Sequence, residues 1–512
     1  MTRGLVSTIL LLIVFFRGTA QETNLEILES PKFREQVRSN EIVGMHATSG
    51  GEKGIVRFAK EHLTLEVFGE ALKPIFTITK PKGKKETHLG TVYHNDQITF
   101  LTINWPKRKV RELYAYVFDI TTRKLTKKLL LTSKVENPKN GMFSRTNSYQ
   151  NRFDHSTSGN YISFVLDDFK SQTNSFTVYV LEIETLAFVF EKTLHEGAEK
   201  FFDLNDILVD DLAHVYLIKK SFFKGRRERK DNTPSVTYRF YRVTEEETKN
   251  TVFEAKDKFI NTLSFGLESE QLMVLGFFTE KKVPKIKGVC SLSFDKASLE
   301  VISKKFDDLP LSVYQDLYGD DEGKAREGKG LGGSLFEGSN GIFYVDHVLK
   351  ADNGSMYLIA EEFYITTNTT STGGFNGTMM TTTTYNYDDI LVIKFKKSGE
   401  MAWGRNIFKR STTPSYNAFL KGNELHLILN SGKNLLEKQD GRTKVSKGWF
   451  ESTSLYDITF SEGGDVNYNK IQDNKGKSYY LPASGTFSNG EFLMISRGDS
   501  PDDPYKTLML LK

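Results

Sequence analysis

Apolar residues recur along this chain at the ends of short segments in which apolar and polar residues alternate. Eight such segments close on a large apolar residue just before a turn, at intervals of roughly 50 to 65 residues, apart from one longer interval. The closing residues are Phe68, Phe118, Ile183, Val243, Phe294, Phe395, Phe460 and Leu511. A period in this range indicates a repeat architecture.

One repeat unit spans residues 86–135. Its four alternating segments, separated by turn-forming residues, are 87–93, 97–104, 112–119 and 125–132. The third is almost entirely apolar or aromatic, as expected of a strand that is covered on both faces. A four-stranded unit that repeats in this way is typical of the blade of a β-propeller. We therefore predict an all-β fold made of a single propeller with eight four-stranded blades.

The number of blades depends on the first repeat, and the closure of the ring depends on the two ends of the chain. The segment from Ile42 to Thr79 has short first strands, and without it the ring would have seven blades. The final segment, Lys506 to Lys512, corresponds to a third strand and leaves the last blade incomplete. The alternating segment Asn24 to Leu28 is predicted to supply the missing strand and close the ring.

The longer interval contains two insertions, at about 311–340 and 366–387. The first includes Gly328, Gly330 and Gly333, which formally match a GxGxxG motif. A dinucleotide site needs an apolar strand before these glycines, whereas the charged segment Lys324 to Glu327 precedes them. We therefore exclude a nucleotide site and expect a surface loop here.

The second insertion is rich in threonine and predicts an extended β-hairpin that projects from one blade. Long loops on a rigid scaffold often carry binding residues. Hydroxyl groups and aromatic rings suit contact with a sugar or a protein surface, although the same residues also simply favour strands. The candidate binding residues are Phe375, Asn376, Tyr385 and Tyr387.

The blade that carries this hairpin also resembles a known group of proteins. The apolar segments 356–360 and 389–395 are followed by a turn at Lys397 to Glu400 and then by Trp403. Over about residues 350–412 this pattern resembles uncharacterised exported β-propeller proteins of Bacteroidetes. The resemblance implies the propeller fold and an exported protein, and it assigns no catalytic residues.

The N-terminus has the features of an export signal. Arg3 precedes the apolar run Ile9 to Phe16, and the small residues Gly18 to Ala20 follow it. We expect a signal peptide at residues 1–20, which leaves a propeller domain at residues 21–512. An uncleaved N-terminal anchor is the alternative. The sequence has no transmembrane segment after it, so the expected location is the periplasm, the outer surface or the extracellular space.

Composition adds little that is specific. The formal net charge is +4, and charged residues of both signs are mixed along the chain. The one cysteine, Cys290, lies in an apolar alternating segment and is expected in the core. The basic run from Lys219 to Lys230 is interpreted as a solvated hairpin loop. We expect no nucleic-acid partner.

Two functional hypotheses remain open, because the sequence contains no recognisable catalytic motif. The nine histidines are scattered, and acidic pairs such as Asp210 and Asp211 are expected to be solvated turns rather than calcium sites. The favoured hypothesis is an exported, monomeric, non-catalytic scaffold that binds a protein or glycan without cofactor or metal. The alternative is a glycoside hydrolase or lyase with carboxylates from separate blades at the central channel.

Overall fold

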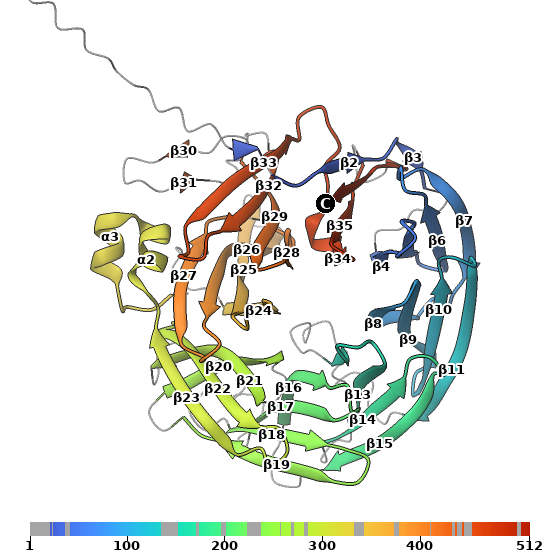
Figure 1. Cartoon of the computed structure of the whole chain (residues 1–512), viewed down its shortest axis with the longest axis horizontal. Helices are drawn as coiled ribbons and strands as arrows, with labels where there is room; N and C mark the ends of the chain where they lie inside the picture. Colours follow the sequence, from blue (N-terminus) through green and yellow to red (C-terminus); the bar gives the residue numbers. More distant parts are fainter. Residues whose placement is uncertain are drawn as a thin grey trace, which may run out of the picture.

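A computed structural model of the chain has eight β-sheets arranged around a common axis (Figure 1). The prediction of an eight-bladed, all-β propeller is therefore confirmed. The described residues are 21–22, 24–35, 41–134, 152–169, 174–195, 201–222, 237–255, 258–267, 271–280, 285–331, 342–372, 378–409, 411–432, 436–437, 443–444, 453–498 and 503–512. The expected signal peptide at 1–20 and the candidate residues Phe375 and Asn376 lie outside this set.

Blades 1 to 4 are each built from four consecutive antiparallel strands, with the first strand innermost and the fourth outermost. Their strands are β4 (Glu41–Ala47), β5 (Lys53–Phe58), β6 (His62–Phe68) and β7 (Pro74–Pro81); β8 (Thr87–His94), β9 (Gln97–Lys107), β10 (Val110–Asp119) and β11 (Lys124–Lys134); β12 (Phe153–His155), β13 (Tyr161–Phe169), β14 (Asn174–Glu182) and β15 (Ala187–His195); and β16 (Phe201–Val209), β17 (Val215–Phe222), β18 (Thr237–Val243) and β19 (Thr248–Phe253). The first repeat is thus a complete blade, and the seven-bladed alternative is wrong.

Blades 5 to 7 follow the same order, and blade 8 takes its outermost strand from the N-terminal region. Their strands are β20 (Lys258–Leu267), β21 (Gln271–Glu280), β22 (Gly288–Asp295) and β23 (Val301–Asp308); β24 (Ile342–Lys350), β25 (Met356–Thr372), β26 (Thr378–Phe395) and β27 (Met401–Ile407); β28 (Tyr416–Lys421), β29 (Glu424–Gly432), β32 (Thr453–Phe460) and β33 (Val466–Asp473); and β34 (Thr486–Ser488), β35 (Glu491–Ile495), β37 (Leu508–Leu511) and β2 (Ile27–Glu29).

Shorter elements flank the blades. Strand β1 (Gln21–Glu22) lies parallel to β33, β3 (Phe33–Arg34) pairs with β36 (Tyr505–Lys506), and β30 (Leu436–Glu437) pairs with β31 (Thr443–Lys444). A 3-10 turn, η2 (Pro482–Ser484), precedes blade 8.

The ring is closed by the N-terminal strand, as the sequence predicted. Strand β2 pairs antiparallel with β37, and Ile27 lies opposite Leu511. On the inner side of the closure, Met45 of blade 1 donates its backbone N–H to the hydroxyl of Tyr93 in blade 2, at 3.2 Å. The same hydroxyl lies 3.5 Å from Thr486 Oγ1 in blade 8. The first, second and last blades therefore meet at one partly buried tyrosine, Tyr93.

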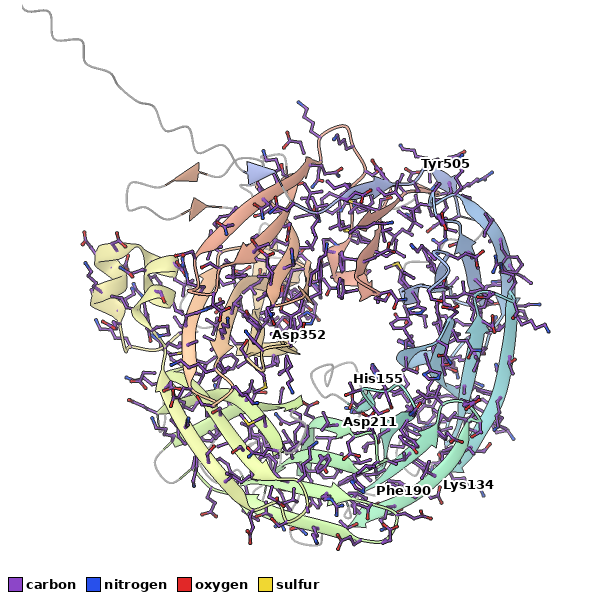
Figure 2. All side chains as sticks on the ribbon, viewed as in Figure 1. Lys134, His155, Phe190, Asp211, Asp352 and Tyr505 are labelled. Atoms are coloured by element: carbon purple, nitrogen blue, oxygen red, sulfur yellow. The ribbon has the colours of Figure 1, made fainter. Side chains whose placement is uncertain are left out.

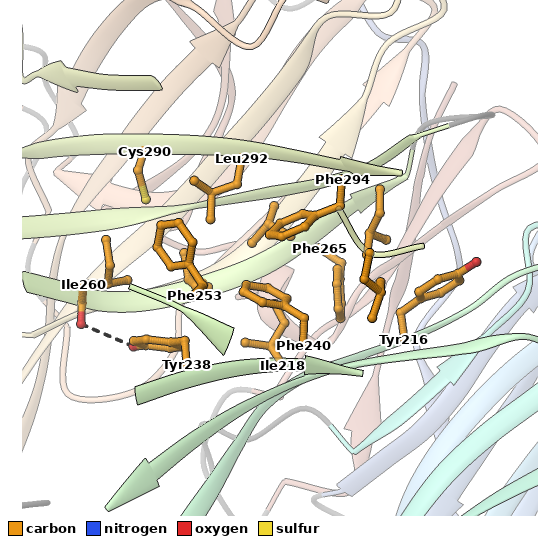
Figure 3. Close-up of a cluster of buried hydrophobic side chains, with 14 of the residues drawn as sticks. Tyr216, Ile218, Tyr238, Phe240, Phe253, Ile260, Phe265, Cys290, Leu292 and Phe294 are labelled. Carbon is orange, nitrogen blue, oxygen red and sulfur yellow. Dashed lines mark hydrogen bonds between the residues drawn. The ribbon is translucent and has the colours of Figure 1, made fainter. Parts of the chain in front are cut away.

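The core consists of apolar side chains that fill the space between neighbouring blades (Figure 2). Each of the eight closing residues named from the sequence lies at the end of a third strand, or one residue beyond it in the case of Ile183, and is at most 4% exposed. Between blades 4 and 5, the rings of Phe240 and Phe294 lie 4.6 Å apart, and Cys290 is buried beside them (Figure 3). Burial raises the pKa of the Cys290 thiol to about 12, which fits its expected role as a core residue.

The first insertion differs from the expected loop, because its first half is helical. Helices α2 (Leu311–Tyr318) and α3 (Asp320–Arg326) lie outside the ring (Figure 1). Arg405 on β27 binds both carboxylate oxygens of Asp316 at 2.8 Å, and Tyr314 is buried against the blade. Helix α3 precedes the glycines of the GxGxxG match, so the arrangement does not resemble a dinucleotide site.

The second insertion is the extended hairpin that the sequence predicted. Strands β25 and β26 stay paired from the blade to Thr372 opposite Thr378. The blade itself ends earlier, because β24 pairs with β25 only as far as Phe363 and β27 pairs with β26 only as far as Ile390. We call the two-stranded part beyond Phe363, residues 364–372 and 378–387, the ribbon.

Candidate functional site

Two β-bulges lie where the ribbon leaves blade 6, and both carry carboxylates. On β24 the pairing skips Asp346, which is an extra residue between Val345 and His347. Between β25 and β26, Glu362 lies opposite two consecutive residues, Asp388 and Asp389. Bulges re-aim side chains and are common beside functional sites. Together with the neighbouring Glu361, these carboxylates form what we call the acidic cluster: Asp346, Glu361, Glu362, Asp388 and Asp389.

One side of the acidic cluster contacts a buried lysine. Glu361 is 5% exposed and forms an ion pair with Lys409, which is 2% exposed. The ammonium of Lys409 also donates to the backbone oxygen of Tyr387 at 2.9 Å. Asp346 is exposed on the innermost strand, where its Oδ2 accepts a hydrogen bond from the Tyr416 hydroxyl at 2.7 Å. Asp346 is therefore the most exposed member of the cluster.

The other carboxylates are held by one phenol and one backbone amide. The Tyr364 hydroxyl donates to Asp388 Oδ2 at 2.7 Å. Asp389 is buried and accepts a hydrogen bond from the backbone of Lys409, while its Oδ1 has no hydrogen-bond partner among the described residues. Glu362 lies near Asp388 and is partly buried.

Restricted hydration raises the pKa of four of these carboxyl groups. Burial, opposed by Lys409 and reinforced by Asp346 and Asp388, raises the pKa of Glu361 to about 7. Burial and then Asp388 raise the pKa of Glu362 to about 7. Although Asp346 is exposed as a residue, desolvation of its carboxyl group by the surrounding protein, opposed by Tyr416 and Lys409, raises its pKa to about 6. Full burial raises the pKa of Asp389 well above its ordinary value. Part of the cluster is therefore protonated near neutral pH.

An aromatic cluster covers the base of the ribbon. Tyr385 stacks on Phe363 with ring centroids 6.3 Å apart, and Tyr387 and Tyr344 lie 5.0 and 5.7 Å from the same ring. Tyr385 is 53% exposed, whereas Phe363 is 9% exposed. The aromatic cluster, Tyr344, Phe363, Tyr385 and Tyr387, thus presents one open ring on a packed support.

The sequence named two of these residues and missed the rest. Tyr385 and Tyr387 come together with Phe363, while Phe375 and Asn376 lie outside the described residues. The acidic cluster was not anticipated, although the pairs Glu361-Glu362 and Asp388-Asp389 interrupt otherwise apolar strands. That interruption of two neighbouring strands at the foot of one hairpin was the available signal.

The acidic cluster can exchange protons and hydrogen-bond to a polar ligand. A carboxyl group with a pKa near 6 or 7 can act as an acid or a base at neutral pH. All five carboxylates belong to blade 6, and only Tyr416 comes from the next blade. Within the described residues, no group of three or more histidine, cysteine, aspartate or glutamate side chains is arranged to hold a metal ion.

The interpretation of the basic run as a solvated loop is wrong for its first four residues, 219–222, which are buried on β17. Lys219 and Lys220 lie on β17 and are 1% and 8% exposed, rather than in a solvated loop. The Lys219 ammonium lies 5.2 Å from the ring centre of Phe202, and Lys220 lies 5.6 Å from that of Tyr238. Contact with aromatic faces stabilises such buried cations. Residues 223–236, with the rest of the run, lie outside the described residues.

Comparison with known protein families finds none that matches this chain, and no curated protein matches it either. Similar solved structures include the β-propeller domain of the Trilobed protease from Pyrococcus furiosus, at 11% identity over 84% of this chain and 98% of that one, with a TM-score of 0.37. They also include the polysaccharide lyase Uly1, at 9% identity over 82% and 89% of the two chains, with a TM-score of 0.37. These similarities are too distant to support any argument about activity.

Among the described residues, no helix is both long and apolar enough to cross a membrane.

Proposed function

We propose that this chain is a non-catalytic binding scaffold that holds a glycan through the aromatic cluster and Asp346. The observation that carries the proposal is Tyr385, whose ring is 53% exposed although it stacks on the buried Phe363. A ring that is already fixed loses little conformational freedom when a ligand binds. Aromatic side chains that are packed on one side and open on the other commonly dominate binding surfaces.

A glycan fits this surface better than a folded protein partner does. The C–H face of a sugar ring can lie flat on an open tyrosine ring, while its hydroxyl groups need hydrogen-bond acceptors nearby. Asp346 is exposed, and it lies on the same strand as Tyr344 of the aromatic cluster. A partly protonated carboxyl group can both donate hydrogen bonds to hydroxyl groups and accept them from hydroxyl groups.

The test is calorimetric binding to a panel of soluble polysaccharides. Replacing the anchor ring in Tyr385→Ala should weaken the binding of a recognised glycan by at least about tenfold, because truncating a central aromatic contact costs about 2 kcal/mol. Tyr505→Ala is the matched control, since Tyr505 is 48% exposed on β36, away from blade 6. Equal affinities for the two variants would contradict the proposed contact surface.

A hydrolase or lyase is the second candidate, and the raised pKa values of Glu361 and Asp346 favour it. A carboxyl group with a pKa of about 6 or 7 matches the requirement for a general acid at neutral pH. The same polysaccharides should be incubated with the protein from pH 5 to pH 8 while reducing ends and unsaturated products are measured. Turnover that disappears in Asp346→Asn, with retained glycan binding, would establish this function in place of the scaffold.

We also propose that the protein is exported and belongs with the exported propellers of Bacteroidetes that residues 350–412 resemble. The support is the sequence of residues 1–20, with its basic start, apolar run and small residues. N-terminal sequencing of the protein recovered after cell fractionation should give a start near Gln21. An intact Met1 in a membrane fraction would indicate the uncleaved anchor instead.

A further inference from the structure

The ribbon has two strand edges that no other strand covers in the described part of the chain. On the inner side, β24 stops at the pair Ile342–Phe363. On the outer side, the last contact is the bridge between Tyr387 and Ser411, where both backbone hydrogen bonds are made. Residues 365–372 and 378–385 extend beyond these points while paired only with each other.

These edges lack the features that normally protect an exposed strand. Edges are usually blocked by charged residues, proline or bulges, which hinder pairing with another chain. No charged residue and no proline occurs from Phe363 to Tyr387, and the register is regular from that pair to the ribbon tip at Thr372–Thr378. Outermost strands elsewhere in the ring differ: β7 contains Pro74 and Pro81, and β11 carries four lysines.

The two edges face in different directions. Strand β25 follows the innermost strand of blade 6, so its free edge continues the inner side of the blade. Strand β26 precedes the outermost strand, so its free edge continues the outer side of the blade.

We propose that the chain forms a dimer in which the β26 edges of two ribbons pair antiparallel about a twofold axis. Pairing of identical edges about a twofold axis closes after two copies and leaves no growing end. An uncharged strand is suited to meeting its own copy, since like charges directly opposite each other would repel. Threonine-rich segments also favour the extended conformation that such pairing needs.

The dimer is expected to be reversible. A stable protein interface buries about 1,600 Å², and contact through two ribbons is smaller than that. The monomer–dimer equilibrium should therefore shift within the concentration range of sedimentation experiments, from about 1 to about 200 µM. This inference does not depend on glycan binding, because it concerns residues 378–385 as a backbone edge and not the ring of Tyr385.

The test introduces two lysines at paired positions of the ribbon, either on β26 or on β25. Thr381 and Thr383 on β26 lie opposite Thr369 and Thr367 on β25. The double variant Thr381→Lys/Thr383→Lys should raise the dimer dissociation constant by more than about tenfold, because edge lysines hinder strand addition. The matched variant Thr367→Lys/Thr369→Lys should change it by less than about threefold. Analytical ultracentrifugation measures both constants.

Hydrogen exchange provides a second readout that does not require a variant. Backbone amides of residues 379–385 should exchange more slowly at 200 µM than at 1 µM, while those of 366–372 should not change. A wild-type protein that remains monomeric at 200 µM overturns the proposal, even if its ribbon captures a strand of another protein. Equal effects of the two lysine pairs also overturn it, because an edge-specific contact must distinguish them.

Discussion

A deeply buried glutamate lies at the start of blade 2 and another lies within blade 6, yet the pKa values of the two carboxyl groups shift in opposite directions. Glu86, which precedes blade 2, is 3% exposed, and Glu361 in blade 6 is 5% exposed. Burial acts to raise the pKa of Glu86, but hydrogen bonds and Lys127 outweigh it and lower the pKa. Burial raises the pKa of Glu361 to about 7 despite Lys409.

The difference lies in the neighbours of each carboxylate. Glu86 accepts hydrogen bonds from the hydroxyls of Thr102 and Tyr116 at 2.6 and 2.7 Å and from the Gly83 amide at 2.9 Å. Glu361 has one cation and two further carboxylates, Asp346 and Asp388, around it. Donors stabilise a charge and neighbouring carboxylates oppose it, so burial alone does not decide the outcome. Glu86 therefore remains ionised at neutral pH and stabilises the fold through its hydrogen bonds, whereas Glu361 can gain or lose a proton near neutral pH.

Replacing Glu86 should have the largest effect on the free energy of unfolding. Glu86→Gln puts an amide –NH₂ where a carboxylate oxygen now faces the Gly83 amide and Lys127, so a donor meets donors. We expect the free energy of unfolding at pH 7.5 to fall by about 3 kcal/mol, because buried donors lose a charged acceptor. Urea denaturation measures this change, with Glu362→Gln in blade 6 as the matched control. A smaller loss in Glu86→Gln than in the control would reverse the comparison.

The dependence of stability on pH should separate the two blades. Glu362 has a folded pKa of about 7, above its ordinary value, so its contribution is fully present below pH 4.5 and is lost as the pH rises through 7. The lowered pKa of Glu86 has the opposite effect, and its contribution is lost as the pH falls below the ordinary range. Between pH 5.5 and pH 8, the free energy of unfolding should fall by about 2 kcal/mol more in the wild type than in Glu362→Gln. If the free energy of unfolding depended on pH in the same way in both proteins, Glu362 would not bind a proton in this range.

The repeat was predictable from sequence because it depends on local patterns. Strand alternation and turns place the closing residues, from Phe68 to Leu511, without any knowledge of tertiary contacts. Helix α2 could not be found in this way, since eight residues give little helical periodicity and the helix depends on the contact between Asp316 and Arg405.

The candidate site was only half predictable. Threonine and tyrosine composition indicated the hairpin and its exposed Tyr385. The acidic cluster depends on bulges opposite Glu362 and at Asp346, and a bulge changes which residues become neighbours without leaving a clear sequence pattern. The interpretation of Lys219 and Lys220 as part of a solvated loop was wrong for a related reason. A run of charged residues in the sequence does not reveal that two of them contact aromatic rings.

The smallest expected effect tests whether Lys409 acts as a counter-ion to Glu361. Lys409→Met removes the cation that pairs with Glu361 and keeps a side chain of similar length. At pH 8, where Glu361 is ionised in the wild type, the free energy of unfolding should fall by about 1 kcal/mol, because the remaining buried carboxylate must stay protonated. At pH 5.5 Glu361 is already protonated, so the loss should vanish. Urea denaturation at the two pH values measures both changes, and an equal loss at both would mean that Lys409 stabilises the blade by packing and by its bond to Tyr387 rather than by its charge.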